Sequence, residues 1–462
     1  MSRNFAISII ETLRQHGFKA YLVGGCVRDL LLKREPADFD VATSATPAQV
    51  MDIFSETYAV GAQFGVVLVP LPEEQRTEQG ENVTPKANAI EVATFRSDLG
   101  YSDGRHPDDV RFSQDPREDV ARRDFTINGM MLDPLCRETT RKANGDANGE
   151  VLDFVGGQKD LEAGIIRAIG EPGRRFAEDK LRMLRAVRFA ARFDYEIEAE
   201  TLAAMQRLAH DVQVVSRERI RDELTKMLTE GHGRRAFLML DQTGLLKEVL
   251  PEISVMKGVR QPPEFHPEGD VFAHTLLLLE NLPHPCPSTL AWGALLHDVG
   301  KPATFRIAPD RIRFDGHVDV GVKIAEEICE RLRFSKHDAA QVLALVDNHM
   351  RFGHVSRMKE STLKKFLRLP SFDEHLALHR ADSLASHRNL STYEFLQRKL
   401  TEIPVEEIRP TALVTGDDLI TAGYVPGPRF REILEAVEDE QLEGRLLSRE
   451  KAIEYVKSAF PL

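Results

Sequence analysis

The chain is poor in cysteine, in long apolar runs and in overall positive charge, and each shortage excludes a class of protein. Its four cysteines (Cys26, Cys136, Cys286 and Cys329) show no paired spacing, which argues against a disulfide framework and a thiolate zinc site. No stretch is long and apolar enough to span a bilayer, and the N-terminus lacks the plan of a signal peptide. We therefore predict a cytoplasmic protein without membrane contact.

The net charge of −12 argues mildly against nucleic-acid binding, for which a basic surface is expected. The charge is uneven, however, because residues 174–192 hold seven Lys or Arg against two acids. A local basic surface is enough to hold one folded RNA. Taken alone, this run indicates only a solvated helix face.

At 462 residues the chain is too long for one hydrophobic core. Short β-like runs at residues 20–23, 39–42, 65–70 and 90–95 give way to helical spacing at residues 178–193, 218–228, 271–281 and 320–332. Polar stretches at 72–88 and 141–150 are typical of loop insertions. We predict an α+β protein with a small N-terminal α/β sheet domain (1–140) followed by all-helical parts (141–258, 259–400 and 401–462).

Asp38 and Asp40 are the most informative pair of acids. On a strand, an Asp-x-Asp spacing puts both carboxylates on one face, where they repel each other unless a cation such as Mg²⁺ lies between them. Two Mg²⁺ ions about 4 Å apart suit phosphoryl transfer. Upstream, Gly24 and Gly25 supply a tight turn that leaves backbone N–H groups for a triphosphate. Together these features favour a catalytic site.

Two further clusters suit a nucleotide. Arg122 and Arg123 precede Asp124 and Asn128, which combines guanidinium forks for phosphate with polar groups for ribose hydroxyls. Asp179 and Arg182 are three residues apart and are expected to share a helix face, where a paired acceptor and donor match the edges of cytosine and adenine. Surface salt bridges would give the same patterns.

In this order and spacing, five segments closely resemble the class II tRNA nucleotidyltransferases (CCA-adding enzymes) and their bacterial poly(A) polymerase relatives. They are residues 21–43 (YLVGGCVRDLLLKREPADFDVAT), 90–96 (IEVATFR), 101–107 (YSDGRHP), 122–129 (RRDFTING) and 176–193 (FAEDKLRMLRAVRFAARF). The resemblance covers residues 18–250. It implies a nucleotidyltransferase head, a helical neck and body, and tRNA, CTP and ATP as partners.

The same resemblance implies residue roles. Asp38 and Asp40 would be catalytic ligands of Mg²⁺, and Asp179 and Arg182 the amino-acid template for CTP and ATP. The other nucleotide-binding residues would be Gly25, Arg28, Arg122, Arg123, Asp124, Asn128 and Arg185. Glu91 is a further acidic candidate at the metals, and Arg105 lies where the family has a flexible loop. Gly129 departs from the family, which commonly has Ala there.

A later helical region carries His274, His297-Asp298 and Asp382, with His317 and His349 between them. His and Asp together suit a divalent metal with open positions for water. The order His…His-Asp…Asp over residues 265–400 resembles the HD phosphohydrolase superfamily. This implies a divalent metal of unknown identity, His317 and His349 as extra ligands or acid/base groups, and Lys301 as a phosphate contact.

The leading hypothesis is therefore an enzyme that adds C, C and A to the 3′ end of tRNA, with a fused phosphatase or 2′,3′-cyclic phosphodiesterase. Alternatives within the class are an A-adding, CC-adding or poly(A)-adding enzyme. An alternative from another class is an HD phosphohydrolase whose N-terminal part only binds RNA. Oligomeric state stays open.

Overall fold

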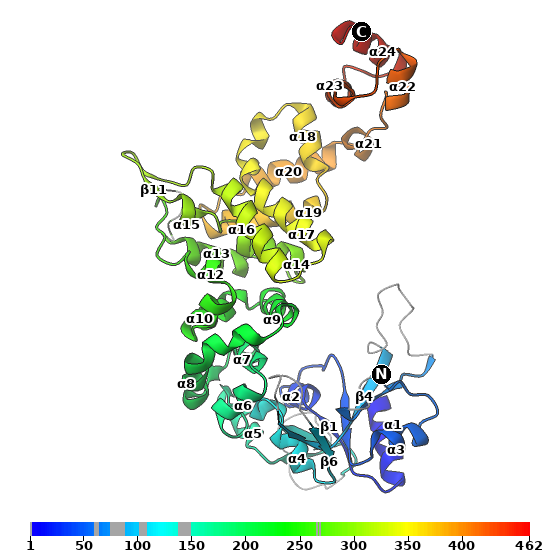
Figure 1. Ribbon diagram of the computed structural model, residues 1–462, viewed down its shortest axis with the longest axis vertical. Coiled ribbons are helices and arrows are strands. Elements are labelled where there is room, and N and C mark those ends of the chain that lie inside the picture. Colours follow the sequence, from blue (N-terminus) through cyan, green and yellow to red (C-terminus); the bar gives the residue numbers. More distant parts are fainter. Residues whose placement is uncertain are drawn as a thin grey trace. The chain divides into compact units, whose positions relative to one another are not determined.

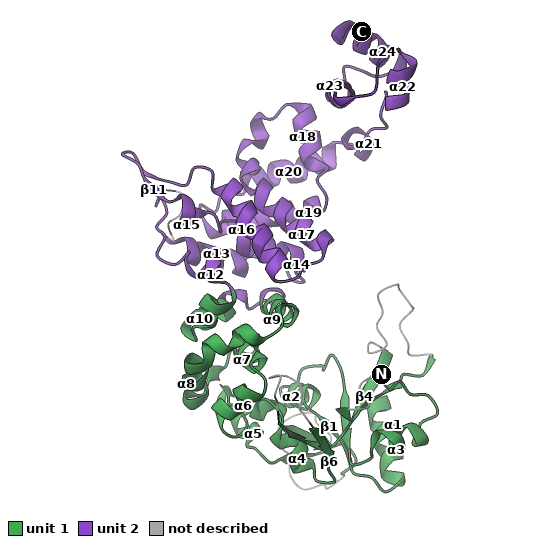
Figure 2. Ribbon diagram, in the orientation of Figure 1, with its two compact units in different colours: residues 1–227, 235–249 green, residues 228–234, 250–462 purple. Residues whose placement is uncertain are grey.

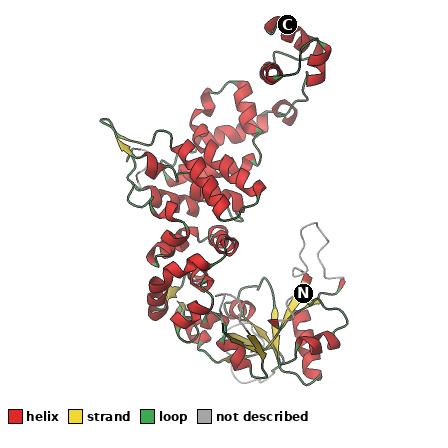
Figure 3. Ribbon diagram, viewed as in Figure 1, coloured by secondary structure: helices red, strands yellow, loops and turns green. Residues whose placement is uncertain are grey.

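The computed structural model describes residues 2–59, 64–73, 88–100, 109–136, 149–264, 267 and 269–462. The chain divides into two compact units, residues 1–227 with 235–249 (unit 1) and residues 228–234 with 250–462 (unit 2; Figure 2). Strands gather in unit 1, whereas unit 2 is largely helical (Figure 3). The predicted α+β class is confirmed, and the division into four parts stays a prediction.

The first half of unit 1 alternates strands and short helices (Figure 1). Its elements are α1 (Ser2–Gln15), β1 (Ala20–Val23), α2 (Gly25–Leu31), β2 (Asp40–Thr43), α3 (Pro47–Ile53), β3 (Val66–Pro70), β4 (Ala89–Thr94), β5 (Arg96–Leu99), β6 (Asp109–Phe112), α4 (Pro116–Ala121), the 3₁₀ turn η4 (Thr126–Asn128), β7 (Met130–Asp133) and β8 (Glu150–Asp153). The strands expected at 20–23, 39–42, 65–70 and 90–95 are found within one residue at each end as β1, β2, β3 and β4.

The central sheet has six strands in the order β3-β4-β2-β1-β7-β8. β2 runs parallel to β4, and the other neighbours are antiparallel. Val23, the last residue of β1, lies opposite Asp40, the first residue of β2, and Asp40 in turn lies beside Glu91 of β4. The end of β1 and the start of β2 therefore share one end of the sheet.

The rest of unit 1 is helical apart from the short parallel pair β9 (Ile165–Ile166) and β10 (Glu196–Ile197). Its helices are α5 (Gly157–Ala163), α6 (Pro172–Glu178), α7 (Leu181–Phe193), α8 (Ala199–Leu208), η5 (Ala209–Val214), α9 (Arg217–Thr229), α10 (Gly233–Gln242) and α11 (Leu245–Val249). α7 is amphipathic, with Met183, Leu184 and Val187 buried and Arg182 and Arg185 on the other side.

Unit 2 is built from helices and one short hairpin, β11 (Arg306–Ile307) with β12 (Ile312–Arg313). Its helices are α12 (Pro251–Ser254), α13 (Val271–Glu280), α14 (Ser288–Leu296), α15 (Lys301–Thr304), α16 (His317–Arg331), α17 (Lys336–Asn348), η6 (His349–Arg357), α18 (Glu360–Leu367), α19 (Phe372–Ala385), α20 (Ser391–Glu402), α21 (Val405–Ile408), α22 (Gly416–Thr421), α23 (Pro428–Leu442) and α24 (Arg449–Ala459). None of the helices formed by the described residues is both long and apolar enough to cross a membrane.

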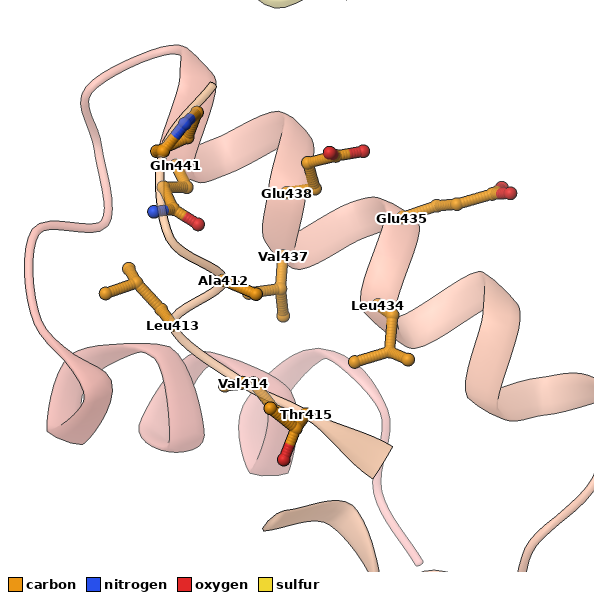
Figure 4. Close-up of a pocket in the computed structure, with 10 residues that line it drawn as sticks. Ala412, Leu413, Val414, Thr415, Leu434, Glu435, Val437, Glu438 and Gln441 are labelled. Atoms are coloured by element: carbon orange, nitrogen blue, oxygen red, sulfur yellow. The ribbon is translucent and has the colours of Figure 1, made fainter. Parts of the chain in front are cut away.

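The last three helices pack around a cluster of their own, which includes Leu419, Ile433 and Val456. Between α23 and the segment before α22 lies a cavity of about 350 Å³. Figure 4 shows Ala412, Val414 and Val437 at this cavity, with the carboxylates of Glu435 and Glu438 turned away from it. The walls of this cavity are mainly aliphatic.

We expect His375 on α19 to make unit 2 sensitive to acid. Its side chain is buried, and neither ring nitrogen has a partner among the described residues. Burial, assisted by Arg351, lowers its pKa to about 4, whereas the unfolded chain titrates near 6.5. Below pH 6.5 the unfolded state binds a proton at this histidine and the folded state does not, so the free energy of unfolding falls as the pH drops towards 4.

His375→Leu removes this proton uptake and should therefore lessen the fall in unfolding temperature between about pH 7.5 and about pH 5. The measurement is thermal unfolding followed by circular dichroism. The control is His337→Leu, because the side chain of His337 is 92% exposed and should leave the pH dependence unchanged. Equal pH dependence in wild type and His375→Leu would contradict the assignment.

Candidate functional site

The turn between β1 and α2 opens a polar pocket at the end of the sheet. Gly24 has φ +76°, a left-handed conformation that favours glycine, and it precedes the first residue of α2. Asp38 lies two residues before β2 rather than within it. The buried Phe39 between them leaves exposed Asp38 and half-buried Asp40 on the open side. Both carboxylates line a pocket of about 650 Å³.

Every residue predicted to bind the nucleotide lines this same pocket. They are Gly25, Arg28, Arg122, Arg123, Asp124, Asn128, Asp179, Arg182 and Arg185. The lining also includes residues that the sequence analysis missed, namely Arg188, Phe189, Arg219 and Lys226. Arg188 continues the three-residue spacing of Arg182 and Arg185 along α7. Arg219 and Lys226 are two turns apart on α9, a spacing that puts them on one face of that helix but does not point to this pocket.

A chain of hydrogen bonds joins α2 to α7 along the pocket wall. Arg28 donates from Nη1 to Asn128 Oδ1 (2.7 Å), and Asn128 donates from Nδ2 to Asp124 Oδ1 (3.1 Å). Asp124 Oδ2 accepts from Arg185 Nε and Nη2 (2.9 and 2.6 Å). Although burial alone would raise the pKa of Asp124, Arg185 and Asn128 lower it to about 2. Asp124 is therefore ionised at neutral pH and fixes its neighbours.

Asp119 holds the two adjacent arginines. Its fully buried carboxylate accepts from Arg122 Nε (2.9 Å) through one oxygen, and from Arg123 Nε and Nη2 (3.2 and 3.0 Å) through the other. Burial would raise its pKa, but the two guanidinium groups hold that pKa below the usual value. The paired arginines are thus a built element of the pocket rather than a surface cluster.

The expectation that Asp179 and Arg182 share one helix face is wrong. α6 ends at Glu178, Asp179 is extended (φ −145°, ψ 107°), and α7 begins at Leu181. The carboxylate of Asp179 caps the new helix by accepting from Leu181 N–H (3.0 Å), which explains the break. Both side chains nevertheless line the pocket.

Asp179 and Arg182 are each held by another residue. Arg219 of α9 donates from Nη2 to Asp179 Oδ2 (2.7 Å). Arg182 donates to Glu178 Oε2 (2.9 Å) and to the backbone carbonyl of Arg122 (2.9 Å). These hydrogen bonds fix the orientation of both side chains in the pocket. Arg219 is a partner that no local sequence pattern predicts.

Three smaller expectations concern Gly129, Glu91 and Arg105. A Cβ at Gly129 would come within 2.9 Å of Ile169 and Val155, so neighbouring side chains fill the space that an alanine would need. Glu91 lies beside Asp40 in the parallel pairing of β4 with β2, although it is not among the pocket-lining residues. Arg105 lies outside the described residues, as do residues 74–87 of the predicted insertion.

The oxygen-only donor set of Asp38 and Asp40 fits Mg²⁺, which prefers carboxylates and water. Both carboxylates face a pocket otherwise lined by many guanidinium groups, the surroundings that a triphosphate with its cation requires. The donor chemistry therefore agrees with the predicted Mg²⁺ site.

A second cluster lies in unit 2, where the predicted His and Asp residues come from five elements or the turns beside them. His274 is on α13, His297 and Asp298 directly follow α14, His317 begins α16, His349 begins η6 and Asp382 is on α19. Their ligand atoms form two groups, each within 4.8 Å, namely His274, His297, Asp382 and Asp298, His317, His349. His297 and Asp298 were expected on a helix but lie in the turn after one.

Three of these histidines are oriented by backbone carbonyls. Nδ1 of His297, His317 and His349 lies 2.8, 2.9 and 2.6 Å from the carbonyl oxygens of Ala294, Phe314 and Val346. A proton on Nδ1 leaves the Nε2 lone pair directed at the cluster, which is how metal-binding histidines are usually held. The donor set therefore fits a divalent metal.

The protonation states suit metal ligands as well. Burial lowers the pKa of His317, and it lowers that of His349 to about 4, so both rings are neutral at pH 7. Burial would raise the pKa of Asp298, but His297 and Lys301 hold it well below its usual range. Lys301 donates to Asp298 Oδ2 (2.7 Å) and to Gln261 Oε1 (2.6 Å), so its role is more than that of a helix-end lysine.

Comparison with known families divides the chain in the same order. Residues 20–167 match the Poly A polymerase head domain, residues 194–256 match the probable RNA and SrmB-binding site of polymerase A, and residues 271–386 match the HD domain. The head match contains Asp38 and Asp40, and the HD match contains all six histidines and aspartates of the second cluster.

Known proteins with similar sequence are CCA-adding enzymes. That of Bacillus pumilus is 40% identical over 244 residues, which is 53% of this chain and 54% of that protein. That of Lactobacillus helveticus is 38% identical over 256 residues, 55% of this chain and 57% of that protein. These matches thus span about half the length of the curated relatives.

Solved structures extend the likeness along the chain. The CCA-adding enzyme of Bacillus stearothermophilus in complex with CTP is 25% identical, with a TM-score of 0.69 over 98% of this chain and 97% of that one. The Thermotoga maritima CCA-adding enzyme complexed with tRNA is 20% identical, with a TM-score of 0.58 over 99% and 95%, and shows the fold alone.

Asp119 should be essential to the stability of unit 1. Asp119→Asn removes the charge between Arg122 and Arg123 and should lower the free energy of unfolding by about 3 kcal/mol, as loss of one partner of a buried ion pair does. Urea unfolding measures this change. Glu118→Gln, an exposed neighbour on the same helix, should change it by less than about 0.5 kcal/mol. Equal stability of the two variants would contradict the role of Asp119 as the buried anion that holds Arg122 and Arg123.

Proposed function

Because the chain belongs to the family of class II tRNA nucleotidyltransferases and carries an HD domain, we propose that it adds C, C and A to the 3′ end of tRNA. The substrates are CTP and ATP, no nucleic-acid template is used, and pyrophosphate is released. The observation that carries this proposal is the single pocket that gathers Asp38 and Asp40, the arginine pair and the Asp179–Arg182 pair.

In the proposed reaction the 3′-hydroxyl of the RNA attacks the α-phosphate of the bound nucleotide. Asp38 and Asp40 would hold Mg²⁺, which supplies activation of the hydroxyl and neutralises charge on the departing pyrophosphate. Arg122 and Arg123, pre-positioned by Asp119, bind phosphate oxygens through charge-assisted hydrogen bonds. Because Asp119 orients these forks in advance, little ordering is left for the substrate to bring about.

The hydrogen-bonded chain from Arg28 to Arg185 suits the ribose. Asn128 and Asp124 offer an amide and an ionised carboxylate to sugar hydroxyls, and their own partners fix their orientation. Asp179 and Arg182 would then read the base, with Asp179 accepting from the amino group of cytosine or adenine and Arg182 donating to the ring nitrogen. Guanine and uracil present the opposite order and are rejected.

The HD domain supports a second activity, a metal-dependent phosphatase or 2′,3′-cyclic phosphodiesterase that repairs RNA ends. His274, His297, Asp298 and Asp382, with His317 and His349, would hold one or more divalent metals, which supply an activated water for attack on phosphorus. Lys301 would contact the phosphate, since its ammonium already lies against Asp298.

The alternative functions differ in the site that they use. A-adding, CC-adding and poly(A)-adding enzymes would use the same pocket, and an HD phosphohydrolase with an RNA-binding module would use only the second cluster. The four unpaired cysteines agree with the cytoplasm, where tRNA precursors are matured.

Three tRNA transcripts test the main activity: one lacking the CCA end, one ending after the first C and one after the second. Each receives Mg²⁺ with CTP, ATP or both, and products are resolved to one nucleotide. We expect every transcript to be completed to CCA and then to stop. Arrest after CC, addition of A only to the CC transcript, or a long A tail would each assign a different relative.

Two substitutions should separate the activities. Asp38→Ala removes a ligand of the pocket and should reduce nucleotide incorporation by at least about 10³-fold while sparing hydrolysis of a 2′,3′-cyclic end. His297→Ala should do the reverse, with hydrolysis measured as phosphate release in the presence of Mg²⁺, Mn²⁺, Co²⁺ or Ni²⁺. Incorporation that survives Asp38→Ala would refute the catalytic assignment of this aspartate.

A further inference from the structure

Beside the histidine cluster of unit 2 lies a pocket of about 640 Å³. Its walls include two of the candidate ligands, His317 and Asp382, and a nonpolar side formed by Ile312, Phe314 and Met350. Small-molecule sites of this size are typically nonpolar with a few polar groups that fix orientation. A phosphate group alone would need neither the volume nor the nonpolar wall.

Phe314 is tied to the ligand cluster through its backbone. Its carbonyl oxygen accepts from His317 N–H (3.1 Å) and lies 2.9 Å from His317 Nδ1, so the same residue orients a candidate metal ligand and lines the pocket. Phe305 packs against the Phe314 ring (centroids 6.0 Å apart), and the Lys301 ammonium lies 5.4 Å from the ring centre. The ring is therefore held at a fixed place near the ligands.

One donor nitrogen on the pocket wall and one behind it, next to Lys301, lack acceptors among the residues that the structure describes. Gln261 is 2% exposed, and its Oε1 accepts from Lys301 while its Nε2 has no partner. Arg313 lines the pocket; its Nη2 donates to Asp310, and its Nε has no acceptor among the described residues. Buried donors without acceptors are costly unless a ligand fills them. The site thus favours a ligand with several acceptors and a flat nonpolar face.

We propose that Phe314 is a specificity-determining residue of the HD site, which stacks on the base of a ribonucleotide whose ribose phosphate lies at the histidine cluster. The proposal rests on the hydrolase activity proposed above and adds the residue by which the site prefers ribonucleotide ends to phosphate esters without a base. Aromatic rings bind all bases in this way, so the selection is for a base and not for one sequence.

Phe314→Ala tests the proposal, because it keeps the carbonyl that orients His317. Hydrolysis of adenosine 2′,3′-cyclic phosphate is compared with that of glycerol 1,2-cyclic phosphate, which has the same ring phosphate without a base. We expect kcat/KM for the nucleotide to fall by about fivefold or more and that for the glycerol ester to stay unchanged. The control is Phe395→Ala, which removes a half-buried ring of α20 that does not line the pocket and should alter neither substrate.

A binding measurement does not depend on activity. With all divalent metal chelated, 2-aminopurine riboside 2′-monophosphate is titrated into each protein, and stacking is followed as fluorescence quenching. We expect quenching with wild type and Phe395→Ala and a marked loss of it with Phe314→Ala. Binding at the nucleotide pocket of unit 1 would quench all three alike.

The outcomes separate the two proposals. If wild type hydrolyses neither ester with any metal, the hydrolase activity fails, and the quenching difference still decides the role of Phe314. If both esters are hydrolysed and Phe314→Ala behaves like Phe395→Ala in rate and in quenching, Phe314 does not stack on the base and the proposal is overturned.

Discussion

Ionised carboxylates buried beneath guanidinium groups are the interaction on which the nucleotide pocket depends. Without Asp119 and Asp124, the arginines around the pocket would repel one another and turn towards solvent. Burial makes each carboxylate costly to ionise, and the adjacent arginines more than offset that cost. The result is a rigid wall of donors that exists before any substrate arrives, which is how electrostatic catalysis avoids reorganisation.

In unit 2, burial and backbone hydrogen bonds prepare the histidines of the second cluster. There burial keeps His317 and His349 neutral, and backbone carbonyls fix which nitrogen carries the proton. The carbonyls of Ala294 and Val346 belong to the last turns of α14 and α17, and that of Phe314 to the loop before α16. His297 follows α14, and His317 and His349 each begin a helix. Helix boundaries, rather than helix faces, thus position most of this cluster.

Sequence reasoning reached the local features and missed the partners across the fold. The strands around Asp40, the glycine turn and every residue predicted for the two clusters could be found because motif spacing and alternation are properties of neighbouring residues. Arg219 and Gln261 could not, because each acts through a contact that only folding creates, whereas Asp119 was missed although its three- and four-residue spacing to Arg122 and Arg123 is local. Arg219 is 40 residues from Asp179, and Gln261 is 40 residues from Lys301. The roles of the site residues stay predictions.

The break between α6 and α7 gives Asp179 and Arg182 a relative placement that a continuous helix could not produce. On one helix their separation would be fixed by the helical repeat. Across the break Asp179 is extended, and its carboxylate accepts from both Leu181 N–H and Arg219. The separation of the two side chains is therefore set by Arg219 and Glu178, which hold them from α9 and from the end of α6, and not by the helical repeat alone.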